Sequence, residues 1–410
     1  MIRYLFLLGL LLGGHELSAR RLTVGLDAQY KTLKGGIVAA QAGDTLLIRS
    51  GIYREGNYLI NKSIHLLGQG NPILDGDGKY EVLTIKSDHV SITGLTIQHT
   101  GWGSLYDFAA IKAFDSKDIK IYKNIINGAY FGIYFSRCNG GWIAENQLVG
   151  ADVEEYKKGN GIHLWQSSGV TIERNNVQYH RDGIYFEFVH QTKIAHNYSR
   201  QNVRYGLHFM FSHDNEYRFN TFENNGAGVA VMYSKRVTME RNRFVANRGG
   251  SAYGLLLKDI NDSRLLYNRF EDNTTGIFAE GSNRLYIAFN RFDRNGWAIK
   301  MMANCMDDSL FFNTFSLNTF DLATNGTTMM NVIRNNYWDK YTGYDLNRDG
   351  KGDIPHHPIS LFALTIEQIP YAILFHRSLM VKLLDLIERA MPSFTPQNMF
   401  DPEPLIKPVI

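Results

Sequence analysis

Cysteine, net charge and long apolar runs are all scarce in this 410-residue chain. Its 43 basic and 40 acidic residues nearly cancel, which excludes the electropositive footprint of a nucleic-acid-binding protein. After the N-terminal leader, no apolar stretch is long enough to cross a bilayer. The chain also lacks a P-loop, a Cys-x-x-Cys pair and a Ser/His/Asp signature. The common nucleotide-binding, redox and acyl-transfer centres are therefore not indicated.

The N-terminus has the pattern of a secretory signal peptide. Arg3 precedes the apolar run Leu5–Leu12, and Leu17-Ser18-Ala19 offers a cleavage site. The run is too short for a spanning helix, although an uncleaved anchor is an alternative. We therefore expect residues 1–19 to be a cleaved signal peptide and the mature chain to be exported.

An asparagine followed two residues later by a bulky side chain recurs through most of the sequence. Successive steps are 22 to 29 residues, and most are 22 or 23. Repeats with this period indicate a solenoid. The asparagines of this repeat are Asn124, Asn146, Asn175, Asn197, Asn220, Asn242, Asn268, Asn290, Asn313 and Asn335.

A glycine stands 14 residues before seven of these asparagines, and a short alternating run follows each glycine, as in Gly183-Ile184-Tyr185-Phe186-Glu187. Alternation with period two is typical of half-buried strands, and no helical-period segment lies inside the repeat. The pattern therefore predicts an all-β, right-handed parallel β-helix of the pectate-lyase type over residues 20–338. Stacked asparagines would then hydrogen-bond from coil to coil.

The residue after each glycine should point into the core and form one apolar row. The row consists of Ile133, Ile162, Ile184, Leu207, Val229, Leu255, Ile277 and, with Ala298 in place of the glycine, Ile299.

Two insertions, Ala151–Asn160 and Ala246–Tyr253, fall at the same corner of the coil. Insertions on one face often mark a binding face, although any turn tolerates them. At the N-terminal end, Tyr30–Ala40 is expected to form a short helix that caps the first coil, before a strand that starts at Asp44. The coil pattern itself becomes regular near Ile64.

Cys138 and Cys305 fall seven coils apart, which is roughly 30–35 Å at the usual strand spacing. A disulfide needs Cα atoms within about 7 Å, so the two cannot pair. We expect two buried thiols.

The segment 339–358 carries an Asp/Gly-rich loop in which Asp345, Asn347, Asp349 and Asp353 occupy positions 1, 3, 5 and 9 of an EF-hand-like pattern. Position 12 is His356 instead of a bidentate Glu, so a complete EF-hand is excluded. A calcium ion completed by Asp339 or a backbone carbonyl is the prediction, and a turn that binds nothing is the alternative.

Residues 359–391 are expected to form two amphipathic helices, Ile359–Gln368 and Tyr371–Ala390, separated by Pro370. They would cover the last coil, lie on a membrane or dock to a partner. Residues 392–410 have no period and four prolines after Ser393, which indicates an extended tail, mobile or ordered only on a partner.

The outward columns are the place to look for chemistry. His208 and Met210 lie on one face of one strand, about 6.5 Å apart, and Met232 lies one coil away. Imidazole and thioether ligands suit Cu(I), so these three residues are a candidate copper contact, with simple packing of the methionines as the alternative. Further soft donors occur at Met301, Cys305, Met306, Met329 and Met330.

An enzymatic reading has weaker support. Asp307-Asp308 is the only adjacent Asp pair, and no Gly-His-Gly, Arg-Ile-Lys or Asp-Pro-His-Glu motif accompanies it. Glu187 with Asp182 and Arg181 is an acid–base candidate, although surface charge at turns explains these residues equally simply. We expect a protein that is not an enzyme, with a carbohydrate-binding or polysaccharide-processing β-helix as the alternative.

Over essentially the whole mature chain, the sequence resembles the NosD family of nitrous-oxide reductase maturation proteins, and its most specific part lies towards the C-terminus. The resemblance rests on Asn335–Tyr341, on the Asp345–Asp353 loop, on Pro358–Phe362, on Leu384–Arg389 and on the tail with Pro392 and Pro396. The coils alone indicate only the broad carbohydrate-binding and sugar-hydrolase β-helix class.

The resemblance implies a periplasmic accessory role without catalysis. NosD-like proteins work with an ABC transporter ATPase and its permease, a copper chaperone and the apo nitrous-oxide reductase, and they support assembly of the reductase's copper–sulfide centre. The C-terminal helices and tail would then attach the protein to the permease, which gives a peripheral association with the membrane.

Overall fold

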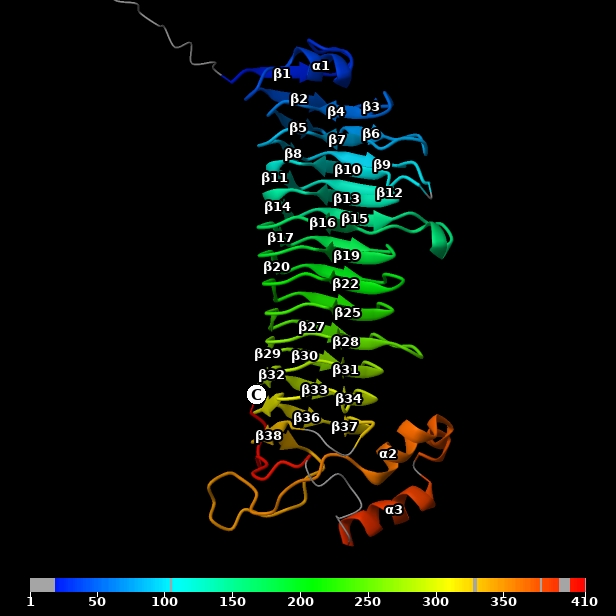
Figure 1. The fold of residues 1–410 in the computed structure, drawn as a ribbon. Helices are drawn as coiled ribbons and strands as arrows, with labels where there is room; N and C mark the ends of the chain where they lie inside the picture. The colour runs from blue at the N-terminus through cyan, green and yellow to red at the C-terminus, as the bar shows by residue number, and fades with distance from the viewer. Residues whose placement is uncertain (1–18, 104, 327–329, 377, 391–398, 410) are drawn as a thin grey trace, which may run out of the picture.

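The computed structural model describes residues 19–103, 105–326, 330–376, 378–390 and 399–409. Within them the chain winds as a parallel β-helix whose coils stack in sequence order (Figure 1). Every ladder between named strands is parallel and joins strands of successive coils, as for Leu207↔Val229. The predicted fold, an all-β right-handed parallel β-helix, is confirmed.

The strands form three long sheets, each contributing one strand to a coil. Sheet A contains β1 Arg21–Val24, β2 Thr45–Arg49, β5 His65–Gln69, β8 Ser91–Thr93, β11 Lys117–Tyr122, β14 Asn139–Ala144, β17 Thr171–Glu173, β20 Lys193–Ala195, β23 Glu216–Arg218, β26 Thr238–Glu240, β29 Arg264–Leu266, β32 Tyr286–Ala288, β35 Ser309–Phe311 and β38 Val332–Arg334.

Sheet B contains β3 Ile52–Tyr53, β6 Ile73–Asp75, β9 Thr96–Gln98, β12 Ile125–Ala129, β15 Gln147–Gly150, β18 Asn176–Gln178, β21 Tyr198–Arg200, β24 Thr221–Glu223, β27 Arg243–Val245, β30 Arg269–Glu271, β33 Arg291–Asp293, β36 Thr314–Ser316 and β39 Tyr337–Trp338.

Sheet C contains β4 Tyr58–Ile60, β7 Leu83–Ile85, β10 Ala109–Phe114, β13 Phe131–Ser136, β16 Ile162–Trp165, β19 Asp182–Glu187, β22 Tyr205–Met210, β25 Ala227–Met232, β28 Tyr253–Lys258, β31 Thr275–Glu280, β34 Trp297–Met301 and β37 Phe320–Ala323. The helices are α1 Leu33–Ala39, α2 Leu361–Gln368 and α3 Leu379–Ala390, with 3₁₀ turns η1 Glu155–Lys157 and η2 Pro370–Phe375.

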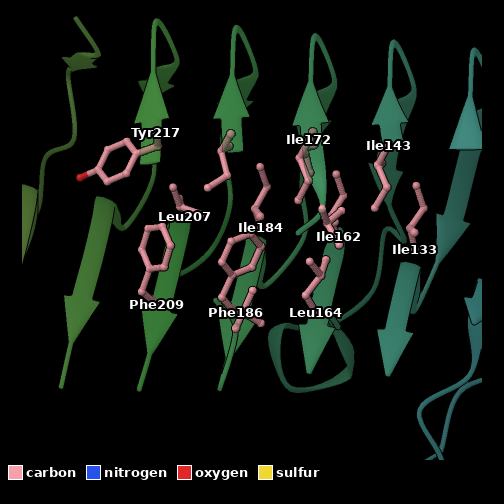
Figure 2. Close-up of a cluster of buried hydrophobic side chains, with 14 of the residues drawn as sticks. Ile133, Ile143, Ile162, Leu164, Ile172, Ile184, Phe186, Leu207, Phe209 and Tyr217 are labelled. Carbon is pink, nitrogen blue, oxygen red and sulfur yellow. The ribbon is translucent and has the colours of Figure 1, made fainter. Parts of the chain in front are cut away.

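The core is a set of stacked apolar rows. The predicted inward row is fully buried, and Figure 2 shows Ile133, Ile162, Ile184 and Leu207 side by side along the axis. A row of aromatic rings runs beside it, and its members stack face to face at 4.1 to 5.6 Å. These rings are Phe222, Phe244, Phe270, Phe292, Phe315 and Trp338.

The asparagine ladder exists as predicted, with one correction. Each Asn Oδ1 accepts the backbone N–H and the side-chain amide of the asparagine one coil earlier, as Asn220 does for Asn197 at 2.9 and 3.0 Å. The last rung is Asn336 and not the predicted Asn335, because Asn336 Oδ1 takes both bonds from Asn313. Asn336 also has the bulky residue of the repeat, Trp338, two positions later.

A second asparagine ladder follows five residues after the first, and sequence reasoning missed it. Asn225 Oδ1 accepts from the backbone N–H and side-chain amide of Asn202, and the pattern continues to Asn318. Its rungs are Asn202, Asn225, Asn247, Asn273, Asn295 and Asn318. The constant offset of five from the first ladder is the signal that could have found it.

The insertions do share one corner, between sheet B and sheet C, where residues 151–160 and 246–252 leave the coil. A third loop, residues 99–108, leaves at the same corner before β10, a coil without the marker glycine. This third loop touches the loop 151–160, since the rings of Trp102 and Tyr156 meet edge to face at 6.4 Å.

The N-terminal cap is present, and strands precede the point near Ile64 where the repeat becomes regular. Leu33 and Ile37 of α1 are buried in the core. Strand β1 precedes the helix and pairs with β2, so the first strand of the β-helix starts at Arg21. The early coils lack the asparagine of the repeat, so they cannot be recognised from that pattern.

The C-terminal end corrects two expectations. The tail is not mobile over residues 399–409, because Met399 and Asp401 are buried against the last coil. The second helix is also shorter than predicted. Pro370 starts the separate turn η2, and α3 begins after Ser378, whose hydroxyl accepts the Val381 N–H. Residues 391–398, which join α3 to this tail, lie outside the described residues, as do residues 1–18 of the expected signal peptide.

Candidate functional site

His208 lies on the outer side of sheet C, as predicted, but it is only 5% exposed. Its ring packs between those of Tyr185 at 5.0 Å and Tyr205 at 4.6 Å. Its Nδ1 is 3.5 Å from a carboxylate oxygen of Asp182, and its Nε2 is buried without a hydrogen-bond partner in the described part of the chain. A carboxylate on Nδ1 orients an imidazole and leaves Nε2 as the free ligand atom, as in many metal sites.

Met210 and Met232 pair directly in the β22–β25 ladder, on the same outer face. Both are partly buried. Because parallel strands are about 4.8 Å apart, the two thioethers and the His208 ring occupy neighbouring positions on two coils. The structure therefore brings the three predicted residues to one surface, and their copper role stays a prediction.

An exposed aromatic stack flanks these methionines. The rings of Phe188, Phe211 and Tyr233 stack at 5.4 and 5.0 Å, and each side chain is about 40% exposed. Each residue sits at the corner directly after its sheet C strand, with φ near +50°. The methionines and this stack form one apolar surface, which we call the Met/aromatic surface.

Asp182 and Tyr205 complete the surroundings of His208, and sequence reasoning did not join them to it. They pair in the β19–β22 ladder, in the position immediately before the marker glycine. The Asp182 side chain is fully buried, and its second oxygen has no hydrogen-bond partner among the residues that the structure describes. The signal in the sequence was the position of Asp182 and Tyr205 immediately before a marker glycine. Spacing alone does not show that a side chain at this position contacts His208, two residues after the glycine.

His163, two coils from His208, is stacked between Tyr134 and Tyr185. Burial lowers the pKa of His163 to about 3, so the ring is neutral. Its Nδ1 is 3.1 Å from the side-chain amide nitrogen of Asn160. His163 is therefore a packed part of the aromatic column.

The loop predicted to bind calcium is satisfied by its own backbone. Asp345 accepts the N–H groups of Asp349 and Gly350 at 3.2 and 3.0 Å, and Asp353 accepts that of Leu346 at 2.7 Å. Over the residues that the structure describes, no group of three or more His, Cys, Asp or Glu is placed to hold a metal ion. Calcium at Asp345, Asn347, Asp349 and Asp353 stays a prediction.

His356 and Asp339 belong to the end cap and not to that loop. The His356 ring contacts Trp338 at 5.2 Å and Tyr341 at 5.8 Å, and burial lowers its pKa to about 3. Asp339 accepts the backbone N–H of Leu317 at 2.5 Å. Completion of the calcium site by Asp339 or by a backbone carbonyl stays a prediction.

The two cysteines are free and buried, as expected. Burial raises the pKa of each thiol to about 11, so both are protonated at neutral pH. Among the other soft donors, Met301 is buried beside Cys305, and Asn331 Nδ2 contacts both Met301 Sδ and the Cys305 carbonyl. Met329 lies outside the described residues.

The C-terminal helices expose a large apolar area. Helix α2 packs through Phe362 and Ile366 on Trp297 and Phe320 of sheet C, and Lys300 pairs with Glu367. The segments that follow α2 carry apolar side chains that are 47 to 82% exposed, which are Ile369, Tyr371, Ile373, Leu374, Phe375, Leu379, Met380, Leu383 and Leu386. None of the described helices has the length and apolar character to span a bilayer.

Comparison with known proteins gives one family match. The family model described as "NosD: Periplasmic copper-binding protein (NosD)" matches residues 149–348. A protein of Stutzerimonas stutzeri named "Probable ABC transporter binding protein NosD" is 27% identical over 372 residues, which is 86% of this chain and 85% of that protein. A protein of Pseudomonas aeruginosa PAO1 with the same name is 29% identical over 132 residues, which is 31% of this chain and 30% of that protein.

Among solved structures, the A-module of mannuronan C-5 epimerase AlgE6 from Azotobacter vinelandii aligns with a TM-score of 0.61 and 13% identity, over 73% of this chain and 92% of that module. At this identity the likeness shows the fold alone. The family match lies on the coils and the Asp/Gly-rich loop, and the Stutzerimonas relative aligns over most of the chain. The chain is therefore similar to the NosD family over residues 149–348, and to a NosD protein over most of its length.

Proposed function

We propose that this protein is a periplasmic assembly factor that supports maturation of the copper–sulfide centre of nitrous-oxide reductase, together with an ABC transporter, a copper chaperone and the apo reductase. The match to the NosD family and the printed names of the relatives support this role. The observation that carries it is the exposed apolar side of η2 and α3. A soluble end cap would bury such side chains or replace them with polar ones.

The apolar side suits a membrane-embedded permease as the binding partner. Leu374 and Tyr371 are 82 and 81% exposed, and Leu379 is 74% exposed. At about 25 cal/mol per Å², covering several such side chains is worth several kcal/mol before the cost of association. Helix α2 is anchored on sheet C, so it would transmit the position of the permease to the rigid solenoid.

Copper would be a transferred ion that this protein binds and passes on, and not its resident cofactor. Neutral imidazole and thioether ligands suit Cu(I), and His208 Nε2 has no other partner among the described residues. The Met/aromatic surface, which contains Met210 and Met232, would present this contact to a partner that carries or receives copper. The calcium ion proposed at Asp345–Asp353 would be structural and stiffen the loop beside the end cap.

The docking proposal is tested by co-purification with the permease and ATPase. A Leu374→Glu/Leu379→Glu variant should lose the transporter, since two charges would enter an apolar interface. A Leu26→Glu/Val38→Glu variant is the matched control, because it charges two equally exposed residues at the other end of the solenoid. Retention of the transporter by the first variant, with an unchanged melting temperature, would refute the proposed docking side.

A polysaccharide-processing function is the alternative. Asp182 and His208 are the acid–base pair that the outer face of sheet C offers. Both are almost completely buried beneath Tyr185 and Tyr205, so a sugar chain would not reach them without rearrangement. We therefore expect no cleavage or epimerisation of uronate or neutral polysaccharides.

A further inference from the structure

A groove of about 390 Å³ lies on the opposite part of the coil from His208, at the corner between sheet A and sheet B. Two columns of side chains border it. The corner column runs from Phe219 through Arg241 and Tyr267 to Phe289 and Phe312. We call this feature the arginine groove, after the strand column described next.

The strand column contains Arg243, Arg269 and Arg291, which are in register on β27, β30 and β33. Successive guanidinium groups therefore start from backbones about 4.8 Å apart. Like charges in such a line repel one another unless anions lie between or beside them.

Only part of this charge is balanced within the chain. Arg243 pairs with Glu271 at 3.0 Å, and Arg291 pairs with Asp293 at 2.5 Å. The exposed guanidinium of Arg269, between them, has no ion pair or hydrogen bond to any residue that the structure describes. The carboxylate of its own strand, Glu271, is the one that binds Arg243.

The opposite wall also favours negative groups. Tyr267, Phe289 and Phe312 stack in parallel at 5.0 and 5.3 Å, so their faces cover one another. Arg241 lies over the Tyr267 face at 5.1 Å and over Phe219 at 5.7 Å. The stacking covers the inner faces of this column, and the ring edges, which carry the positive end of the aromatic quadrupole, border the groove.

We propose that the arginine groove binds a small polyanion, a ligand with two or more carboxylate or phosphate groups about one coil apart, and that Arg269 is its main contact. Guanidinium binds both kinds of group through two parallel hydrogen bonds. The volume is in the range of small-ligand sites, and Val409 of the tail closes one end. The site is independent of the copper and permease proposals, since it shares no residue with them.

Isothermal titration of the full mature chain tests this proposal. The probes are pyrophosphate, digalacturonate and a neutral disaccharide at low salt. We expect one or both anions to bind and the neutral sugar not to bind, and the better anion identifies phosphate or carboxylate as the natural group. Affinity should fall as salt is added.

Arg269→Ala should weaken binding about tenfold or more. Arg269→Lys should give an intermediate loss, because lysine keeps the positive charge but cannot donate two parallel hydrogen bonds to one anionic group. Arg264→Ala is the control, because it removes an exposed arginine of the same coil on sheet A and should leave affinity within about twofold. Failure of both anions to bind at millimolar concentration, or an equal loss in the Arg264 variant, would overturn the proposal.

Discussion

Asp401 accepts hydrogen bonds from both the backbone N–H and the side-chain amide of Asn336, at 2.8 and 3.2 Å, across 65 positions of sequence. These are the two bonds that each asparagine of the first ladder accepts from the asparagine one coil earlier. Asp401 therefore acts as the final rung, and the same oxygen accepts the Trp338 indole N–H at 3.1 Å. The tail ends the solenoid by satisfying donors that another coil would otherwise have satisfied.

We predict that Asp401→Ala lowers the free energy of unfolding by about 3–5 kcal/mol, because buried donors of Asn336 and Trp338 lose their acceptor. Asp401→Asn should retain much of the stability, since its amide oxygen replaces the accepting carboxylate oxygen. Urea unfolding measures both, with the exposed Asp27→Ala as the control. Equal stability of the alanine variant and the wild type would remove Asp401 from the ladder.

The second ladder makes a separate prediction at Asn247. Its Oδ1 accepts the Asn225 N–H at 3.0 Å, and its side-chain amide donates to Asn273 Oδ1 at 2.9 Å. Asn247→Ala should cost about 2–4 kcal/mol, and Asn247→Asp should cost at least as much because a carboxylate would face the Asn273 oxygen. The control is Asn325→Ala, an exposed asparagine that accepts one bond, which should cost about 1 kcal/mol or less.

A pH dependence follows from Asp308. Burial raises the pKa of this carboxyl to about 7, whereas the unfolded chain releases the proton near pH 4. Between those values the folded state holds more protons, so this group's contribution to stability falls as pH rises from about 4 to 7, by of order 4 kcal/mol. Asp308→Asn should abolish this part of the pH dependence, as measured by the difference in the free energy of unfolding between pH 5 and pH 8. An identical slope in both proteins would contradict it.

Copper binding is predicted to depend on the thioethers. Titration of Cu(I) into the mature protein should show a site that is lost in a Met210→Ala/Met232→Ala variant and weakened by His208→Phe. A Met380→Ala variant, which removes an exposed methionine on α3, is the control. Equal binding by the double variant and the wild type would exclude the Met/aromatic surface as the copper contact.

The repeat determined the coil, the inward row of Ile184 and Leu207, the first asparagine ladder and the separation of Cys138 from Cys305, because each depends only on spacing within or between coils. Spacing also placed His208, Met210 and Met232 on one side of sheet C. It did not predict that His208 is nearly buried, since that burial comes from the size of Tyr185 on the neighbouring strand β19 and of Tyr205 on its own strand β22.

Only the tertiary structure decided the contacts between segments far apart in the sequence and between neighbouring rows of side chains. Asp401 reaches Asn336 because an aperiodic tail folds back, and no local pattern predicts such a return. The arginine groove exists because two columns meet at one corner, where Arg269 is left without the carboxylate that Arg243 takes. The sequence by itself therefore set the spacing of this solenoid, whereas side-chain packing between coils decided which of its residues are open to a ligand.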